Sequence, residues 1–179
     1  MISGDLNQCS INLLSDFLKS DVYVVFGSSY IKGELVDFLV KQKTINIHAG
    51  VSPYYRGTDC NFWALYDDNT HLVGTTIHLL SKGLDSGPVL YHALTDIKNN
   101  LYEYTMSAVK SSFHSVADRI KDGSIFKIQP EIQNKQLRYS KKEDFNEEVV
   151  KLFLNKQVDL NSKKFDKKLF NEPYILKSK

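Results

Sequence analysis

The pattern of apolar and polar positions predicts alternating strands and helices over the first two thirds of the chain. Residues 22–26 and 44–48 are short apolar runs of the kind that form buried strands. Between them, apolar residues at positions 35, 36, 38 and 39 have helical spacing, and an earlier helix is expected from Ser10 to Lys19. Two strands joined by a helix form a βαβ unit, whose right-handed crossover places the loops after both strands at one edge of a sheet.

Residues 74–80 and 89–93 are predicted to be two further strands, joined by a turn rich in glycine and serine. A short helix is expected at 61–66. A long helix, beginning at Asn99 or Asn100 and ending before Gly123, is the longest expected element. The order of these elements predicts an α/β fold with a mainly parallel sheet and helices on both faces.

The last third of the chain has a different pattern. Residues 125–128 and 137–139 could form short strands, and a helix carrying Phe145, Val149 and Phe153 should follow. From Ser140 onward ten lysines face seven acidic residues, which is typical either of a surface that contacts phosphate or of a solvated face. We therefore expect a core over residues 1–123 and a small carboxyl-terminal extension over 124–179.

Charge and cysteine content narrow the class of protein. The 179 residues fit one domain, and 23 Lys and Arg against 21 Asp and Glu give a net charge of +2, which argues against nucleic acid as the main partner. Cys9 and Cys60 form no C-x-x-C pattern, so neither a disulfide framework nor a metal site is indicated. We expect a cytoplasmic protein with no membrane partner, because neither a signal region nor a long apolar run is present.

Candidate chemistry lies where residues 44–48 run into a loop. Side chains two apart on a strand share a face, so Asn46 and His48 should present an amide and an imidazole side by side. Asp85, in the later turn, could join them at the same edge of the sheet. Such a trio suits acyl transfer to an amine, because the amide and imidazole stabilise an oxyanion and the carboxylate orients the imidazole. An isolated Asn-x-His pair is also common as two satisfied polar side chains.

Five short motifs occur in order between about residues 22 and 93. They are Asn46-Ile47-His48, Tyr55-Arg56-Gly57, Trp63-Ala64-Leu65, Gly-Thr-Thr-Ile-His at 74–78, and Gly-Leu-Asp-Ser-Gly-Pro-Val-Leu at 83–90. Together they resemble the core of the 10-formyltetrahydrofolate-dependent formyltransferase family. The resemblance implies a Rossmann-like formyltransferase core and an enzyme that uses 10-formyltetrahydrofolate as formyl donor, without a metal.

The resemblance also implies roles for individual residues. Asn46 and His48 would hold and polarise the formyl oxygen, and the catalytic carboxylate Asp85 would set the protonation of His48 and help to remove a proton from the amine. Two turns would grip the pterin of the cofactor through exposed main-chain groups. These cofactor-binding residues would be Phe26, Gly27, Ser28, Ser29, Tyr30, Ile31, Gly83, Leu84 and Asp85. His78, within a strand, is expected to be structural.

The acceptor amine is less defined by the motifs. Tyr55, Arg56 and Gly57, the expected substrate-binding residues, resemble the tRNA and sugar branches of the family more than the glycinamide ribonucleotide branch. The segment from Gln129 to Phe145 is similar to the region after the core in sugar-nucleotide N-formyltransferases. A nucleotide-linked amino sugar is therefore the favoured acceptor. The alternatives are a methionyl-tRNA or glycinamide ribonucleotide formyltransferase, or a reduced module that binds folate or nucleotide without catalysis.

One departure from the family pattern concerns the start of the chain. Family members place several strands and helices before the strand that corresponds to residues 22–26, whereas only 21 residues precede it here. The amino-terminal part of the family domain is thus expected to be missing, because the sequence is either a fragment of a longer protein or a reduced variant. Residues 22–26 would then form an open sheet edge, and an open edge of buried type favours pairing with another chain, so we expect a homo-oligomer, most simply a dimer.

Overall fold

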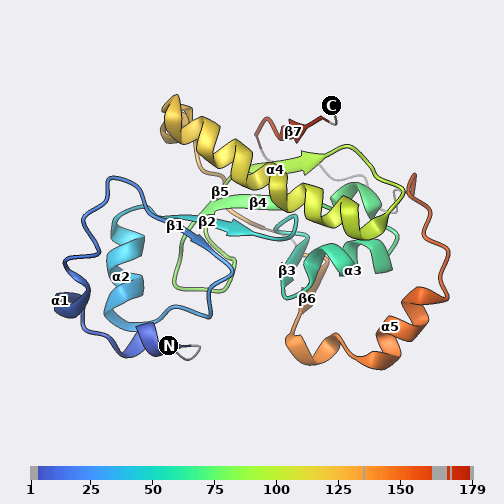
Figure 1. Ribbon diagram of the computed structural model, residues 1–179, viewed down its shortest axis with the longest axis horizontal. Coiled ribbons are helices and arrows are strands. Elements are labelled where there is room, and N and C mark those ends of the chain that lie inside the picture. The colour runs from blue at the N-terminus through green and yellow to red at the C-terminus, as the bar shows by residue number, and fades with distance from the viewer. Residues whose placement is uncertain (1–3, 135, 163–168, 170, 178–179) are drawn as a thin grey trace.

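The computed structural model describes residues 4–134, 136–162, 169 and 171–177, and its centre is a five-stranded sheet (Figure 1). The strand order is β1-β2-β4-β5-β7. Two further strands, β3 and β6, form a separate pair beside it. The strands are β1 (Val24–Phe26), β2 (Ile45–His48), β3 (Tyr55–Gly57), β4 (Thr75–Leu79), β5 (Val89–Thr95), β6 (Arg138–Ser140) and β7 (Tyr174–Leu176).

The sheet combines parallel and antiparallel neighbours. β1 and β2 are parallel, as expected for a βαβ unit, and β5 and β7 are parallel as well. β2 pairs antiparallel with β4, and β4 pairs antiparallel with β5. The separate pair of β3 and β6 is parallel. The predicted α/β fold with helices around the sheet is confirmed, and its two antiparallel pairings arise because β4 reverses direction after the loop and helix that follow β2.

Helices cover both faces of the sheet. The α-helices are α1 (Ile11–Leu14), α2 (Gly33–Lys41), α3 (Cys60–Tyr66), α4 (Leu101–Lys121) and α5 (Glu147–Leu154). On one face, Ile45 and Ile47 of β2 share an apolar cluster with Val116 of α4, the long helix that runs across the strands in Figure 1. The alternate residues of β2 therefore point to the opposite face, which α2 borders.

The first helix is shorter than the sequence predicts. Ser10 caps it as expected, because its side chain accepts a hydrogen bond from the backbone N–H of Leu13. The helix ends at Leu14 rather than Lys19. The apolar stripe that predicts the longer helix consists of Ile11, Leu14, Phe17 and Leu18. Phe17 is 81% exposed and the other three are only half-buried, so packing supports the helix weakly.

The segment after α4 adds strands to both sheets. β6 pairs with β3, and β7 pairs with the edge strand β5. The sequence predicts a strand at 125–128, but Ser124–Lys127 forms a 3₁₀ turn directly after α4, with Ile125 buried against the sheet. Between these elements Arg138 donates two hydrogen bonds to Asp67 and lies over the ring of Trp63, which fastens β6 to α3.

β1 is an edge of the sheet. It pairs with β2, and no other described strand lies beside it. Val24 and Phe26 are 45% and 43% exposed, although Phe26 makes an edge-to-face contact with Phe113 of α4. The apolar run at 22–26 is therefore a strand with a partner on one side among the described residues. In that same part of the chain no helix combines the length and the apolar character needed to cross a membrane.

Candidate active site

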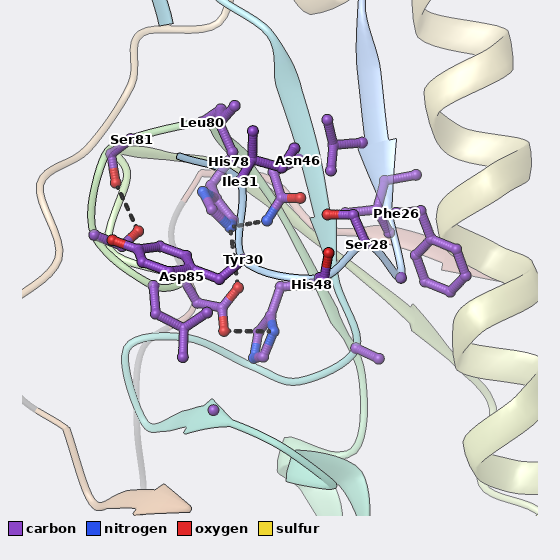
Figure 2. Close-up of a pocket in the computed structure, with 18 of the residues that line it drawn as sticks. Phe26, Ser28, Tyr30, Ile31, Asn46, His48, His78, Leu80, Ser81 and Asp85 are labelled. Carbon is purple, nitrogen blue, oxygen red and sulfur yellow. Dashed lines mark hydrogen bonds and ion pairs between the residues drawn. The ribbon is translucent and has the colours of Figure 1, made fainter. Parts of the chain in front are cut away.

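β2 delivers the first two candidate residues to one face of the sheet. Ile45 and Ile47 are 3% exposed and face the core, so Asn46 and His48 necessarily point to the other side. There they border a cavity of about 310 Å³ at the end of β1 and β2, drawn in Figure 2. The arrangement is the one that the alternation along residues 44–48 predicts.

His78 holds the Asn46 side chain. The two residues are direct partners in the β2–β4 register, and Asn46 Nδ2 lies 2.9 Å from His78 Nε2 (Figure 2). His78 Nδ1 lies 2.9 Å from the carbonyl oxygen of Leu79, which can only accept a hydrogen bond. His78 therefore carries its hydrogen on Nδ1 and accepts from the Asn46 amide at Nε2. Burial lowers the pKa of His78 to about 4, which keeps the ring neutral.

Asp85 approaches His48 from the turn between β4 and β5. Its Oδ2 lies 3.3 Å from His48 Nδ1, and the two side chains are 12% and 6% exposed. The other ring nitrogen, His48 Nε2, lies 3.2 Å from the carbonyl oxygen of Tyr55. The second carboxylate oxygen of Asp85 lies 4.0 Å from His78 Nε2, beyond hydrogen-bond distance. The carboxylate thus pairs with His48 in a setting largely screened from water.

The three candidate catalytic residues and both candidate cofactor turns line the same cavity. The first turn, residues 26–31, forms the wall next to β1, and residues 83–85 form the opposite wall. Tyr30 joins the two walls, because its hydroxyl donates a hydrogen bond to the carbonyl oxygen of Lys82. The expected residues found in the lining are Phe26, Gly27, Ser28, Ser29, Tyr30, Ile31, Asn46, His48, Gly57, Gly83, Leu84 and Asp85.

Gly87 allows the Asp85 turn to lie close to β4. A Cβ atom at this position would come within 1.7 Å of the Leu79 carbonyl oxygen and 3.0 Å of His78 Nδ1. The backbone of the turn therefore packs directly on the strand that carries His78. This close approach is what brings the Asp85 carboxylate to the end of β2.

The three expected substrate-binding residues have different environments. Gly57 lines the cavity and pairs with Ser140 of β6. Tyr55 is 1% exposed, and its hydroxyl lies in hydrogen bonds with Asn69 and Asp67, away from the cavity. Arg56 donates from Nη2 to the Leu84 carbonyl oxygen at 2.7 Å. Arg56 thus supports the turn that carries Asp85, and the assignment of these three residues to substrate binding stays a prediction.

Two polar residues at the site are not singled out by the sequence. Thr58 lines the cavity directly after Gly57. Gln133 contacts the Asp85 turn through two main-chain carbonyls, although it lies far along the chain. Neither residue belongs to a periodic pattern that would mark it. Within the described part of the chain, no group of three or more His, Cys, Asp or Glu side chains is placed to hold a metal ion.

The arrangement is chemically suited to transfer of an acyl group to an amine. Asn46 has one amide N–H on His78. The second N–H has no hydrogen-bond partner among the described residues and can stabilise an oxyanion in the cavity. His48 and Asp85 form a neighbouring pair that can hold and pass on a proton. A nucleophilic Ser or Cys is not required if the attacking group is an amine of the substrate.

Comparisons with known protein sequences indicate one family. The chain matches the family model described as Formyl transferase over residues 11–121, which is more than half of its 179 residues. It is 32% identical over 91 residues to the methionyl-tRNA formyltransferase of Clostridium acetobutylicum. That match covers 51% of this chain and 29% of the relative, so the chain spans less than a third of that relative's length.

Solved structures show the same relationship at the level of the fold. The formyltransferase PseJ from Anoxybacillus kamchatkensis, in complex with UDP-4,6-dideoxy-4-formamido-L-AltNAc and tetrahydrofolate, has a TM-score of 0.56 and 28% identity, covering 71% of this chain and 67% of PseJ. A 4-N formyltransferase from Francisella tularensis has a TM-score of 0.59 at 21% identity, covering 76% and 57% of the two chains. The protein belongs to the formyl transferase family.

Proposed function

We propose that this protein transfers a formyl group from 10-formyltetrahydrofolate to a primary amine, most simply that of a nucleotide-linked amino sugar. The observation that carries the proposal is the convergence of Asn46, His48 and Asp85 on one cavity, with the carboxylate 3.3 Å from His48 Nδ1. Family membership over residues 11–121 supports the same reaction class.

The size of the cavity supports a folate as the formyl donor. Its two walls, residues 26–31 and 83–85, border a space of about 310 Å³, near the lower limit of ligand pockets. A flat heterocycle rich in donors and acceptors suits such walls. The pterin end of the donor would be enclosed, and the remainder would extend outside the cavity. Tetrahydrofolate in the PseJ complex supports this choice of donor.

In the proposed reaction the acceptor nitrogen attacks the formyl carbon, and a carbon–nitrogen bond forms as the carbonyl becomes an oxyanion. The free N–H of Asn46 stabilises this oxyanion. The bond between the formyl carbon and N10 of the folate then breaks as the carbonyl re-forms. The proton lost by the amine passes to the pair formed by Asp85 and His48, entering at the Asp85 carboxylate, and a proton is returned to N10. The products are a formamide and tetrahydrofolate.

Two observations bear on the acceptor. The similarity to PseJ, whose complex contains a UDP-linked formamido sugar, favours an amino sugar on a nucleotide. The similarity to methionyl-tRNA formyltransferases over 91 residues favours the amino group of methionyl-tRNA as the second candidate. Arg56 is engaged with the Leu84 carbonyl through Nη2, and its expected role in acceptor binding stays a prediction.

A panel of acceptors tests the proposal. Purified protein is incubated with 10-formyltetrahydrofolate and, separately, a UDP-linked 4-amino sugar, initiator methionyl-tRNA or glycinamide ribonucleotide, and mass spectrometry detects the formylated product. We expect product with the amino sugar. Product with methionyl-tRNA alone would support the second candidate, and binding of the donor without product from any acceptor would contradict catalysis.

Substitutions in the trio test the assigned roles. His48→Ala and Asp85→Asn should lower kcat by about 10²-fold or more, because each removes a group that handles the transferred proton. Matched controls are His114→Ala and Asp16→Asn, whose side chains are exposed and outside the cavity. Wild-type turnover in both site variants would refute the assignment.

A further inference from the structure

The turn that carries Asp85 has an unusual backbone. Asp85 has a φ of 46°, in the left-handed region that residues with a Cβ seldom occupy. Its carboxylate must nevertheless stay in place to meet His48 at 3.3 Å. A turn in such a conformation persists when surrounding contacts hold it. The groups that contact the backbone of this turn therefore decide where the carboxylate lies.

Gln133 holds the turn from outside the cavity. Its Nε2 donates to the carbonyl oxygen of Asp85 at 2.9 Å and to that of Gly87 at 2.6 Å. Both hydrogens of the amide are thus directed at the turn. Arg56 adds a third bond, from Nη2 to the Leu84 carbonyl oxygen at 2.7 Å. Carbonyl groups before, at and after the left-handed residue are fixed by two side chains.

Gln133 is itself positioned by a short backbone bridge. Glu131 and Val89 exchange two hydrogen bonds of 2.8 Å each in antiparallel fashion. Val89 begins β5 directly after the Asp85 turn, so this bridge places Gln133 next to the carbonyls that it bonds. Gln133 is not among the residues that line the cavity, and its side chain contacts the site through the carbonyls of the turn.

We propose that Gln133 is a positioning residue, which holds the Asp85 turn in its left-handed conformation and thereby sets the carboxylate against His48. This inference rests on the proposed formyl transfer for its kinetic consequence. The hydrogen bonds to Asp85 and Gly87 are donated by an amide, so an isosteric side chain without N–H groups removes them with little change in volume.

The kinetic test compares three variants. Gln133→Met and Gln133→Glu remove both donors, and Gln136→Met is the matched control, an exposed glutamine in the same segment. We expect kcat to fall by about 10²-fold in the first two, with KM for the amine unchanged, because misplacing one reacting group affects the chemical step more than binding. In the control, kcat should equal that of the wild type.

A double variant separates positioning from general support of the fold. If Gln133 acts through the Asp85 carboxylate, Gln133→Met should cause no further loss of kcat in an Asp85→Asn background. Additive losses would overturn the inference. Thermal melts that show both Gln133 variants to be unfolded at the assay temperature would also overturn the inference. Gln133 would then support the whole fold rather than this turn.

A spectroscopic readout keeps the test independent of turnover. Long-range ¹H–¹⁵N spectra of the imidazole rings report which nitrogen of His48 carries hydrogen, with the signals assigned from His48→Gln. We expect hydrogen on Nδ1, facing Asp85, in the wild type and in Gln136→Met, and a reduced share in Gln133→Met. A wild type that formylates no acceptor but shows this change would refute the proposed function and support positioning. If the wild type formylates an acceptor, and spectra and kcat are unchanged in Gln133→Met, the proposed function is supported and positioning by Gln133 is refuted.

Discussion

The amide of Asn46 has a defined orientation because a neutral histidine accepts one of its hydrogens. His78 directs Nδ1–H to the Leu79 carbonyl and offers Nε2 to Asn46 at 2.9 Å. Burial lowers the pKa of His78 to about 4, so near neutral pH the ring does not become a second donor facing the amide. The contact with His78 thereby fixes the amide plane of Asn46 at the wall of the cavity.

Replacing His78 tests this orientation. His78→Phe keeps a flat ring but removes the acceptor, and we expect kcat to fall by about 10-fold to 10²-fold, since the donor to the oxyanion loses its fixed direction. His78→Gln, which retains an acceptor oxygen, should lose less. The measurement is steady-state kinetics with the acceptor identified in the panel. Equal losses of kcat in both variants would contradict this role, because the effect would then come from the imidazole ring as a whole and not from its acceptor nitrogen.

Among the elements, β1 is one of the two edge strands of the five-stranded sheet in the described structure. Its outer edge carries backbone groups with no partner strand among the described residues, and Val24 and Phe26 are about half exposed. An open apolar edge is a template for pairing with another strand. The homo-oligomer expected from the sequence therefore remains a prediction, and the outer edge of β1 is its expected interface.

Sedimentation tests this edge. We expect the wild type to sediment as a dimer at micromolar concentration, and Val24→Lys to shift it toward the monomer, because a charge on an open edge opposes strand pairing. Leu13→Lys, at a position 68% exposed but outside the sheet, should leave the dimer unchanged. A folded wild-type protein that sediments as a monomer would contradict the prediction.

Some elements could be predicted from local pattern and others could not. α2, β2, α3 and α4 follow from apolar periodicity and capping, and Asn100 caps α4 as expected. β7 has only three residues, and its pairing partner β5 lies far back in the chain, so no local pattern marks it. The strand predicted at 125–128 is wrong. A short apolar run is compatible both with a strand and with the 3₁₀ turn found at Ser124–Lys127, and its pattern does not distinguish the two.

At the scale of the whole molecule, two buried histidines make stability depend on pH. Burial lowers the pKa of both His78 and His92 to about 4, against an ordinary value of 6.5. Between these values the unfolded chain binds more protons than the folded one, so the free energy of unfolding rises with pH. Acidification from pH 6.5 toward pH 4 should cost on the order of 3 kcal/mol for each histidine.

Urea denaturation between pH 4 and pH 7 measures this loss. His92 lies outside the candidate site, with Nε2 2.8 Å from the Ser52 carbonyl oxygen, so His92→Gln removes one ionisable group and leaves the catalytic trio intact. We expect the variant to lose about half of the pH dependence. A free energy of unfolding that stays constant from pH 7 to pH 4 in the wild type would show that these rings are not neutral and buried.

The sequence by itself determined the βαβ unit, the long helix and the presentation of Asn46 and His48 on one face, because helical and strand periodicities act over a few neighbouring residues. Only the tertiary structure decided how Asp85 meets His48, that His78 orients Asn46, and that Gln133 holds the Asp85 turn. These contacts join residues far apart in the chain, and they depend on strand register and close backbone packing, as at Gly87. Such distances are set when the whole sheet assembles, and no local pattern encodes them.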